Sequence, residues 1–250
     1  MRAGLLAAAG CVVAAAVMAQ LPYLALPVCA AALADISLRG RPIAAAVLAG
    51  ATTALSALLW GPRGAAIAVV GLAGVLAAIA WLDRGSPWTA LITRGVRYTV
   101  TFVAIDAADA WLAGESLMEG LRSLAESNSE VAATVARLAG VDAAAGEAQG
   151  LSETLFMTWP ASYVVTGTVT AILVASAIGW MARRHGRERN ALPPLSQIDV
   201  SPHVLWIPLA GVACLVAARF VDSNSAILAA VGWNALLVAW PLFAWQGFAV

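Results

Sequence analysis

The stretch WNALLVAWPLFAWQGFAV, residues Trp233 to Val250, has no charged residue in 18 positions. It contains one proline and two amide side chains, Asn234 and Gln246, among residues otherwise suited to lipid. About 20 residues of α-helix cross roughly 30 Å of hydrocarbon, so this stretch predicts a membrane-spanning helix. Each amide then needs hydrogen-bond partners, because an unsatisfied polar group in hydrocarbon is costly.

The same character extends through the chain. Hydrophobic residues make up 62% of the 250 residues and charged residues only 11%, whereas soluble domains carry about 25% charge. Further uncharged runs cover residues 3–34, 43–60, 65–82, 154–182 and 204–218. The composition predicts an all-α, multi-pass transmembrane helix bundle, a single integral membrane domain over residues 1–250.

The positions of proline and glycine predict where the apolar runs divide. QLPYLALP (Gln20–Pro27) divides the first run, since proline removes a helix donor. GPRG (Gly61–Gly64) predicts a tight turn. The beginning of the chain also has features of a signal peptide, but the apolar sequence continues and favours a retained first helix. We expect about eight spans, one of them short or re-entrant, over residues 3–20, 23–38, 43–60, 65–82, 88–112, 154–182, 204–220 and 226–248.

Arginine placement predicts the orientation, because basic loops stay cytoplasmic. All 14 basic residues are arginine. With both termini inside, four face outward: Arg63, Arg122, Arg137 and Arg219. The other ten face the cytoplasm: Arg2, Arg39, Arg41, Arg84, Arg94, Arg97, Arg183, Arg184, Arg187 and Arg189. We therefore expect a bacterial cytoplasmic (inner) membrane protein with both termini cytoplasmic.

Residues 113–153 form a polar, acidic, extracytoplasmic segment. Leu117, Leu121 and Leu124, followed by Val131, Val135 and Leu138, recur at helical spacing and predict two short amphipathic helices. Seven acidic residues accompany two arginines in this segment. It is either a solvated connector or a lid over an outward-facing cavity.

Residues 183–203 form a basic cytoplasmic loop. Its arginines are explained by topology and by attraction to anionic headgroups, and we expect no nucleic acid partner, since no aromatic residue alternates with them. His185 and His203 lie 18 residues apart, which is not a metal-binding spacing. Cys11, Cys29 and Cys214 are isolated within apolar runs and are interpreted as small buried hydrophobes. We expect no metal and no cofactor.

The predicted helix 88–112 carries charge into the membrane. Arg94 and Arg97 lie near its inner end, and Asp106 and Asp109 lie toward its outer end. Only about 13–14 Å of uncharged helix separates Arg97 from Asp106, so this helix should not face lipid on all sides. At 100° per residue one side carries Arg94, Arg97, Tyr98, Thr101 and Asp109, with Asp106 at its margin. This side is either the wall of a solute pathway or an ion-paired packing face, for example with Asp35.

Other polar groups allow both packing and binding roles. Ser162, Thr166 and Thr170 are spaced by four residues in the predicted helix 154–182, and Pro160 should bend its outer end. Their hydroxyls can bond to the carbonyls of their own helix, which favours packing. Asn234 and Gln246 are expected to bond to a neighbouring helix, with a binding-site role as the alternative.

Three stretches together carry a family resemblance: TWPASYVV (Thr158–Val165), GWMARRHGRERNALPPLSQIDVSPHVLWIPL (Gly179–Leu209) and the final WNALLVAWPLFAWQGFAV. In these the chain resembles the YybS-like family of bacterial membrane proteins. The resemblance covers about residues 154–250 and implies an inner-membrane protein with distant kinship to the substrate-binding subunits of energy-coupling-factor vitamin transporters. That family usually continues past the final "QG" with apolar sequence, so the end at Val250 suggests a shortened chain.

Two functions follow from these patterns. The first is a membrane subunit that binds or transports a small solute; with no GxxxxGK[ST] motif, it would need an ATPase or membrane partner subunit to use ATP. In that case Gly10, Ala14, Ala15 and Ala19 offer small-residue spacing for docking the partner. The second is a non-catalytic scaffold or assembly factor in envelope biogenesis. An enzyme is not expected, because HExxH and GxSxG are absent and Asp106 and Asp109 lie on one helix.

Overall fold

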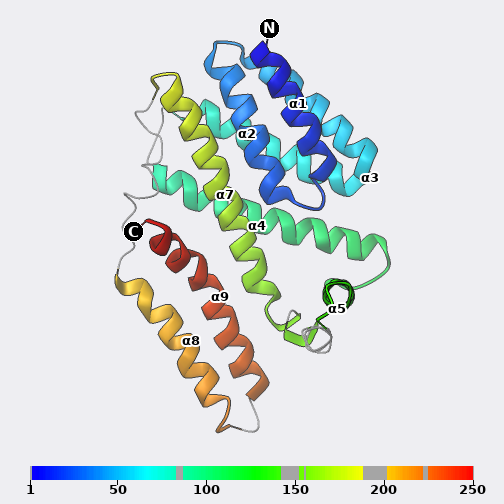
Figure 1. Cartoon of the computed structure of the whole chain (residues 1–250), viewed down its shortest axis with the longest axis vertical. Coiled ribbons are helices and arrows are strands. Elements are labelled where there is room, and N and C mark those ends of the chain that lie inside the picture. The colour runs from blue at the N-terminus through cyan, green and yellow to red at the C-terminus, as the bar shows by residue number, and fades with distance from the viewer. Residues whose placement is uncertain are drawn as a thin grey trace. The chain divides into compact units, whose positions relative to one another are not determined.

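The computed structural model describes the backbone of residues 2–82, 87–141, 152–154, 156–187, 202–221 and 225–249 (Figure 1). Every regular element within these ranges is a helix. The chain divides into two compact units. Unit 1 comprises residues 1–105 and 166–194, and unit 2 comprises residues 106–165 and 195–250.

Three consecutive helices form the main packed layer of unit 1. α1 (Arg2–Val17), α2 (Pro22–Leu38) and α3 (Pro42–Ala80) all contact one another (Figure 1). Their core consists of large apolar side chains with 1% exposure or less: Met18, Leu26, Leu33, Leu72 and Val75. The chain leaves α1 after Val17 and begins α2 at Pro22, which confirms that the apolar run 3–34 is divided.

α3 consists of two arms joined at Gly61. This glycine has φ 61° and ψ −150°, a conformation open almost only to glycine, and Pro62 follows it. The Ser56 hydroxyl donates to the Gly64 carbonyl oxygen at 3.1 Å, although eight residues of continuous helix would span about 12 Å. The turn expected at GPRG is therefore confirmed.

In unit 2, α8 (Trp206–Ala217) and α9 (Ser225–Ala249) pack side by side (Figure 1). The short 3-10 helix η2 (Pro202–Leu205) precedes α8. Gly211 and Gly232 lie at the contact, and a Cβ atom on Gly232 would come within 2.8 Å of the Gly211 carbonyl oxygen. Paired glycines thus allow the two backbones to approach closely.

The acidic segment 113–153 contains one long helix, α5, where two short ones were expected. α5 (Leu117–Leu138) runs without interruption, so the prediction of two helices is wrong. No glycine or proline occurs between Leu121 and Leu138 to end the helix. The polar residues 126–130 separate the two apolar sets, but Ser129 among them is buried, and its hydroxyl donates to the Glu126 carbonyl oxygen at 2.9 Å. The amphipathic character is confirmed, with Leu124, Val131, Val135 and Leu138 on one exposed face.

Two helices contribute residues to both units. α4 (Pro87–Leu112) matches the predicted helix 88–112, and α7 (Trp159–Arg184) begins later than the predicted helix 154–182. Thr158 is a turn, and Pro160 occupies the second position of α7. Proline is tolerated there because the first turn of a helix has no internal partner for its N–H. Pro160 therefore starts α7 after a break, where a bend within the helix had been predicted.

The described helices suit a lipid environment. Two are long and apolar enough to cross a membrane, Pro42–Ala80 and Trp159–Arg184. Shorter apolar helices cover Leu6–Val17, Pro22–Leu38, Trp206–Ala217 and Ser225–Trp240. This all-helical composition agrees with a multi-pass membrane bundle.

Candidate functional site

The arginine-bearing part of α4 lies against α3 within unit 1. Arg97 Nη2 donates a hydrogen bond to the Val70 carbonyl oxygen at 3.2 Å. A Cβ atom placed on Gly74 would lie 3.4 Å from Cζ of Arg97 and 3.6 Å from the hydroxyl oxygen of Tyr98. Gly74 therefore leaves the space in which a guanidinium group and a phenol group of α4 approach the same point on α3.

Tyr98 is the unusual member of this group. Its side chain is only 1% exposed, and its hydroxyl has no hydrogen-bond partner in the described part of the chain. The ring itself is well packed, since Phe102 stacks on it with ring centroids 6.2 Å apart. Buried tyrosine hydroxyls normally have a partner, because burial without one is costly. The ring is thus held in place, while its hydroxyl has no partner in the described part of the chain.

Two arginines near Tyr98 have no counter-charge among the described residues. Arg94 lies one helical turn before Tyr98 and is half-buried. Neither Arg94 nor Arg97 forms an ion pair with any described residue. Two guanidinium groups next to a buried hydroxyl, without a carboxylate, are suited to bind an anion.

Asp35, which we had considered as a partner for these arginines, pairs elsewhere. Its two carboxylate oxygens each accept a hydrogen bond from Arg39 at 3.0 Å. His185 Nε2, just after the end of α7, lies 2.9 Å from Asp35 Oδ1. The suggested ion pairing of α4 with Asp35 is therefore wrong, because an arginine one turn further along α2 already occupies the carboxylate.

The two aspartates of α4 belong to unit 2. Asp106 accepts a hydrogen bond from the hydroxyl of Tyr163 of α7. Trp159 packs edge-on against the Tyr163 ring at a centroid distance of 6.0 Å and holds that ring in position. Asp109 is half-buried one turn further along α4. The predicted polar face of α4 thus comprises an arginine portion in unit 1 and an aspartate portion in unit 2.

Asn234 bridges a gap in the backbone hydrogen bonding before α7. Its Oδ1 accepts from the Ala161 N–H at 2.9 Å, and its Nδ2 donates to the Met157 carbonyl oxygen at 2.9 Å. In a continuous helix these two backbone groups would bond to each other. Nδ2 also donates to Ala230 O at 2.7 Å. The expected bond between Asn234 and a neighbouring helix is confirmed.

The remaining predicted polar residues have local roles or lie outside the description. Ser162 and Thr170 donate to the carbonyl oxygens of Thr158 and Thr166, at 3.1 Å and 2.7 Å, which confirms bonding within their own helix. Gln246 belongs to α9, but its side chain is outside the part of the chain that the structure describes, so its expected bond to a neighbouring helix stays a prediction.

The structure also brings together two residues that the sequence left apart. Cys11 of α1 and Cys29 of α2 are buried neighbours, and Thr52 of α3 lies close to Cys11. Spacing along the chain carries no signal for this contact, because it depends on how three separate helices pack. The described residues contain no cluster of three or more His, Cys, Asp or Glu side chains suited to a metal ion.

Apolar helices with few charged positions define the chain as a helical membrane protein. The family model described as "Predicted membrane protein (DUF2232)" matches residues 6–250, and the chain belongs to this family. No curated protein and no solved structure matches the chain.

Proposed function

We propose that this protein is an inner-membrane subunit that binds a small anionic solute at Arg94, Arg97 and Tyr98. The observation that carries the proposal comes from the described part of the chain: the buried Tyr98 hydroxyl has no hydrogen-bond partner there, and the two neighbouring arginines have no counter-ion there. A carboxylate or phosphate group would accept hydrogen bonds from all three side chains and neutralise the charge of the half-buried Arg94 and the exposed Arg97. The proposal includes no catalytic step.

Gly74 supports this assignment by its position. The atoms nearest to a Cβ atom there are those of Arg97 and Tyr98, at ordinary contact distances. Alanine would fit with small adjustments, whereas a larger side chain would displace the guanidinium and phenol groups. A charged group inside a membrane protein usually faces a bundle interior or an aqueous path, and such groups often mark a solute site.

The proposal extends to topology and coupling. Eight spans with both termini in the cytoplasm would place ten of the 14 arginines on the inner side. As in the energy-coupling transporters that the YybS-like resemblance suggests, ATP would be used by a partner subunit. The small residues of α1 are poor candidates for docking that partner, because Ala14, Ala15 and Ala19 are buried within unit 1.

The test compares solutes retained by the full-length protein purified in mild detergent. Small anions released on denaturation are identified and quantified by mass spectrometry for the wild type, the double variant Arg94→Gln/Arg97→Gln, and Tyr98→Phe. The matched control is Arg122→Gln, which removes an exposed arginine of α5. Gly74→Ala and Gly74→Leu test the space above α3.

We expect the wild type, Arg122→Gln and Gly74→Ala to retain the same anion. The double variant and Gly74→Leu should lose it by at least about tenfold, since two charge-assisted hydrogen bonds contribute roughly 1.5–3 kcal/mol each. Tyr98→Phe should show a smaller loss. Equal retention of the anion in all variants, or no specifically bound anion, would overturn the proposal.

A second candidate function rests on the exposed apolar face of α5. Leu124, Val131, Val135 and Leu138 are each at least half exposed and follow one side of the helix, as in a surface that docks a partner. This arrangement fits a non-catalytic scaffold or assembly factor. Under this alternative Val131→Asp/Val135→Asp removes the cellular phenotype, while Asp106→Asn/Asp109→Asn leaves it intact. The reverse pattern would exclude the scaffold.

A further inference from the structure

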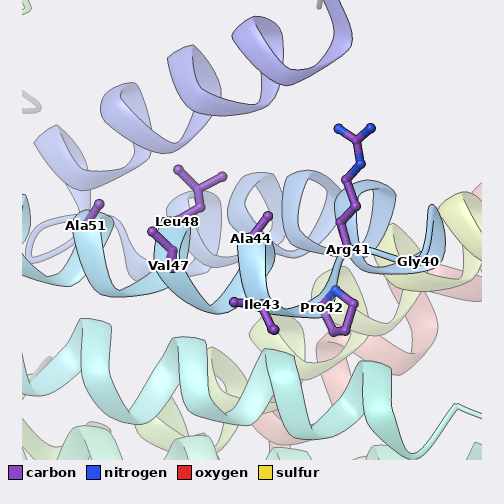
Figure 2. Close-up of a pocket in the computed structure, with 8 residues that line it drawn as sticks. All are labelled: Gly40, Arg41, Pro42, Ile43, Ala44, Val47, Leu48 and Ala51. Carbon is purple, nitrogen blue, oxygen red and sulfur yellow. The ribbon is translucent and has the colours of Figure 1, made fainter.

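An apolar groove follows the first arm of α3. Its volume is about 680 Å³, and its apolar lining includes Ile43, Ala44, Val47, Leu48 and Ala51 (Figure 2). Figure 2 shows Arg41 at one end of this row and Ala51 at the other. Ile43 is 80% exposed and Val47 66% exposed, so the chain leaves these apolar side chains uncovered.

The two arginines in the turn between α2 and α3 differ in their charge balance. Arg39 forms two 3.0 Å hydrogen bonds with the Asp35 carboxylate. Arg41 is exposed, and its guanidinium forms no ion pair or hydrogen bond with a described residue. The guanidinium of Arg41 is therefore open to an anion from outside the described part of the chain.

We propose that this groove binds one acyl chain of an anionic phospholipid whose phosphate pairs with Arg41. The nine residues from Ile43 to Ala51 rise by about 12 Å along the helix, enough to contact a large part of one acyl chain. Arg41 lies in the turn between the apolar helices α2 and α3. If both helices cross the membrane, this turn lies at the level where a headgroup phosphate meets the hydrocarbon. Lipid is the occupant because the surface combines one unpaired cation with a continuous apolar strip.

The experiment measures lipid retained by the full-length protein, using native mass spectrometry in detergent. The probes are phosphatidylglycerol and phosphatidylcholine with identical oleoyl chains, added in equal amounts. The variants are Arg41→Gln, with Arg39→Gln as its matched control. A second pair of variants tests the groove itself. Ala44 lines the groove, so Ala44→Trp should fill it. Ala46 is exposed but outside the lining, so Ala46→Trp is the control.

We expect the wild type to retain phosphatidylglycerol about fivefold more than phosphatidylcholine, as one arginine near an anionic headgroup contributes about 1 kcal/mol. Arg41→Gln should lose this preference, and Arg39→Gln should keep it. Ala44→Trp should lower the retention of both lipids, and Ala46→Trp should not. The groove-filling pair keeps the test valid if Arg39→Gln destabilises the fold.

Four results would overturn the proposal. The first is equal retention of the two lipids by the wild type. The second is an equal effect of the two arginine substitutions or of the two tryptophan substitutions. The third is a change of oligomeric state in Ala44→Trp without a change in lipid retention, which would assign the groove to a second copy of the chain. Complete displacement of phosphatidylglycerol by inorganic phosphate would likewise show that the acyl chain makes no contribution.

Discussion

At the scale of single residues, the described polar side chains in apolar helices mostly bond to backbone groups. Asn234 is the clearest case, because both ends of its amide contact the backbone of the segment at Met157 and Ala161. Pro160 in that segment cannot donate to its preceding turn, and Thr158 is a turn residue. The amide thus restores hydrogen bonding at the point where the backbone is interrupted.

We predict that Asn234→Leu lowers the free energy of unfolding by about 1–2 kcal/mol. Leucine has a similar size but leaves the Ala161 N–H and the Met157 carbonyl unpaired in apolar surroundings. Reversible unfolding in mixed micelles, followed by helix content, measures the change. Asn234→Asp keeps the acceptor for Ala161 and should fall between the leucine variant and the wild type. An unchanged unfolding free energy for Asn234→Leu would contradict the bridging role.

Glu119 gives a prediction for pH at the start of α5. The Ser116 N–H donates to Glu119 Oε2 at 2.7 Å, and the Glu119 N–H donates to Ser116 Oγ at 3.3 Å. Hydrogen bonds from the Ser116 side chain and backbone lower the pKa of the Glu119 carboxyl. A lowered pKa means that the cap stabilises the helix above about pH 4.3 and is lost as pH falls through the lowered value.

Hydrogen exchange of residues 117–121 checks this prediction. Protection in the wild type should decrease between pH 6 and pH 3 relative to Glu119→Gln, measured at the same pH so that the chemical exchange rate cancels. Glutamine keeps the shape of the capping box but has no charge to lose in this range. Identical pH dependence in the two proteins would show that the carboxylate does not hold the cap.

Residue patterns in the sequence anticipate only some of these contacts. The need of Asn234 for a neighbouring helix follows from its chemistry, since hydrocarbon offers no hydrogen bonds. The i, i+4 spacing of Asp35 and Arg39 also favours their pairing, although Asp35 had been suggested as a partner for the predicted helix 88–112. The contacts of Asp35 with His185 and of Cys11 with Cys29 depend on the register of separate helices, and one sequence contains no signal for that register.

At the scale of elements, glycines determine how closely α4 and α7 approach in unit 1. A Cβ atom on Gly167 of α7 would lie 2.7 Å from the backbone nitrogen of Thr99 and 3.0 Å from the Gly95 carbonyl oxygen of α4. A Cβ atom on Gly95 would meet nothing nearer than 3.8 Å, on Thr168. At this crossing, Gly167 is therefore needed for the close approach of the two helices, whereas Gly95 has room for a methyl group.

We predict opposite effects for alanine at these two glycines. Gly167→Ala should lower the free energy of unfolding by about 1–3 kcal/mol, because backbone atoms of α4 must move. Gly95→Ala should raise it by up to about 1 kcal/mol, since alanine favours the helix and fits. Unfolding of both variants in the same micelles gives the comparison. Equal effects of the two substitutions would contradict the crossing seen here.

The breaks between elements were more predictable than their continuity. The turn at Gly61 follows from a glycine next to a proline, and the division of the apolar run 3–34 follows from Pro22. Glycine and proline act directly on their own backbone, so their effect can be predicted without knowing the fold. The division of α5 was predicted wrongly, because a polar interval was taken for a break. Ser129 lies in that interval, but its hydroxyl bonds within the helix, so the polar residues do not end it.

At the scale of the whole molecule, two local breaks decide the orientation of everything that follows them. If residues 3–34 formed one helix, every later loop would move to the opposite side of the membrane. The structure divides this run between Val17 and Pro22, and it divides α3 at Gly61. If each helical segment crosses the membrane, each added turn reverses the chain once. The sides of the loops would then follow from the number of segments, and the arginine count would supply an independent check.

We predict that alkaline phosphatase fused after Gly146 is active and that the same reporter fused after Arg187 is inactive. The two positions flank α7, so they should lie on opposite sides of the membrane if that helix crosses it. Residues 113–153 carry seven acidic side chains, whereas four arginines occur within residues 183–189, and basic segments remain in the cytoplasm. Green fluorescent protein at the same positions should give the inverse pattern, because it does not fluoresce when exported unfolded. Phosphatase activity after Arg187, or its absence after Gly146 in a chain that is stably expressed, would reverse the orientation and move Arg41 to the outer leaflet.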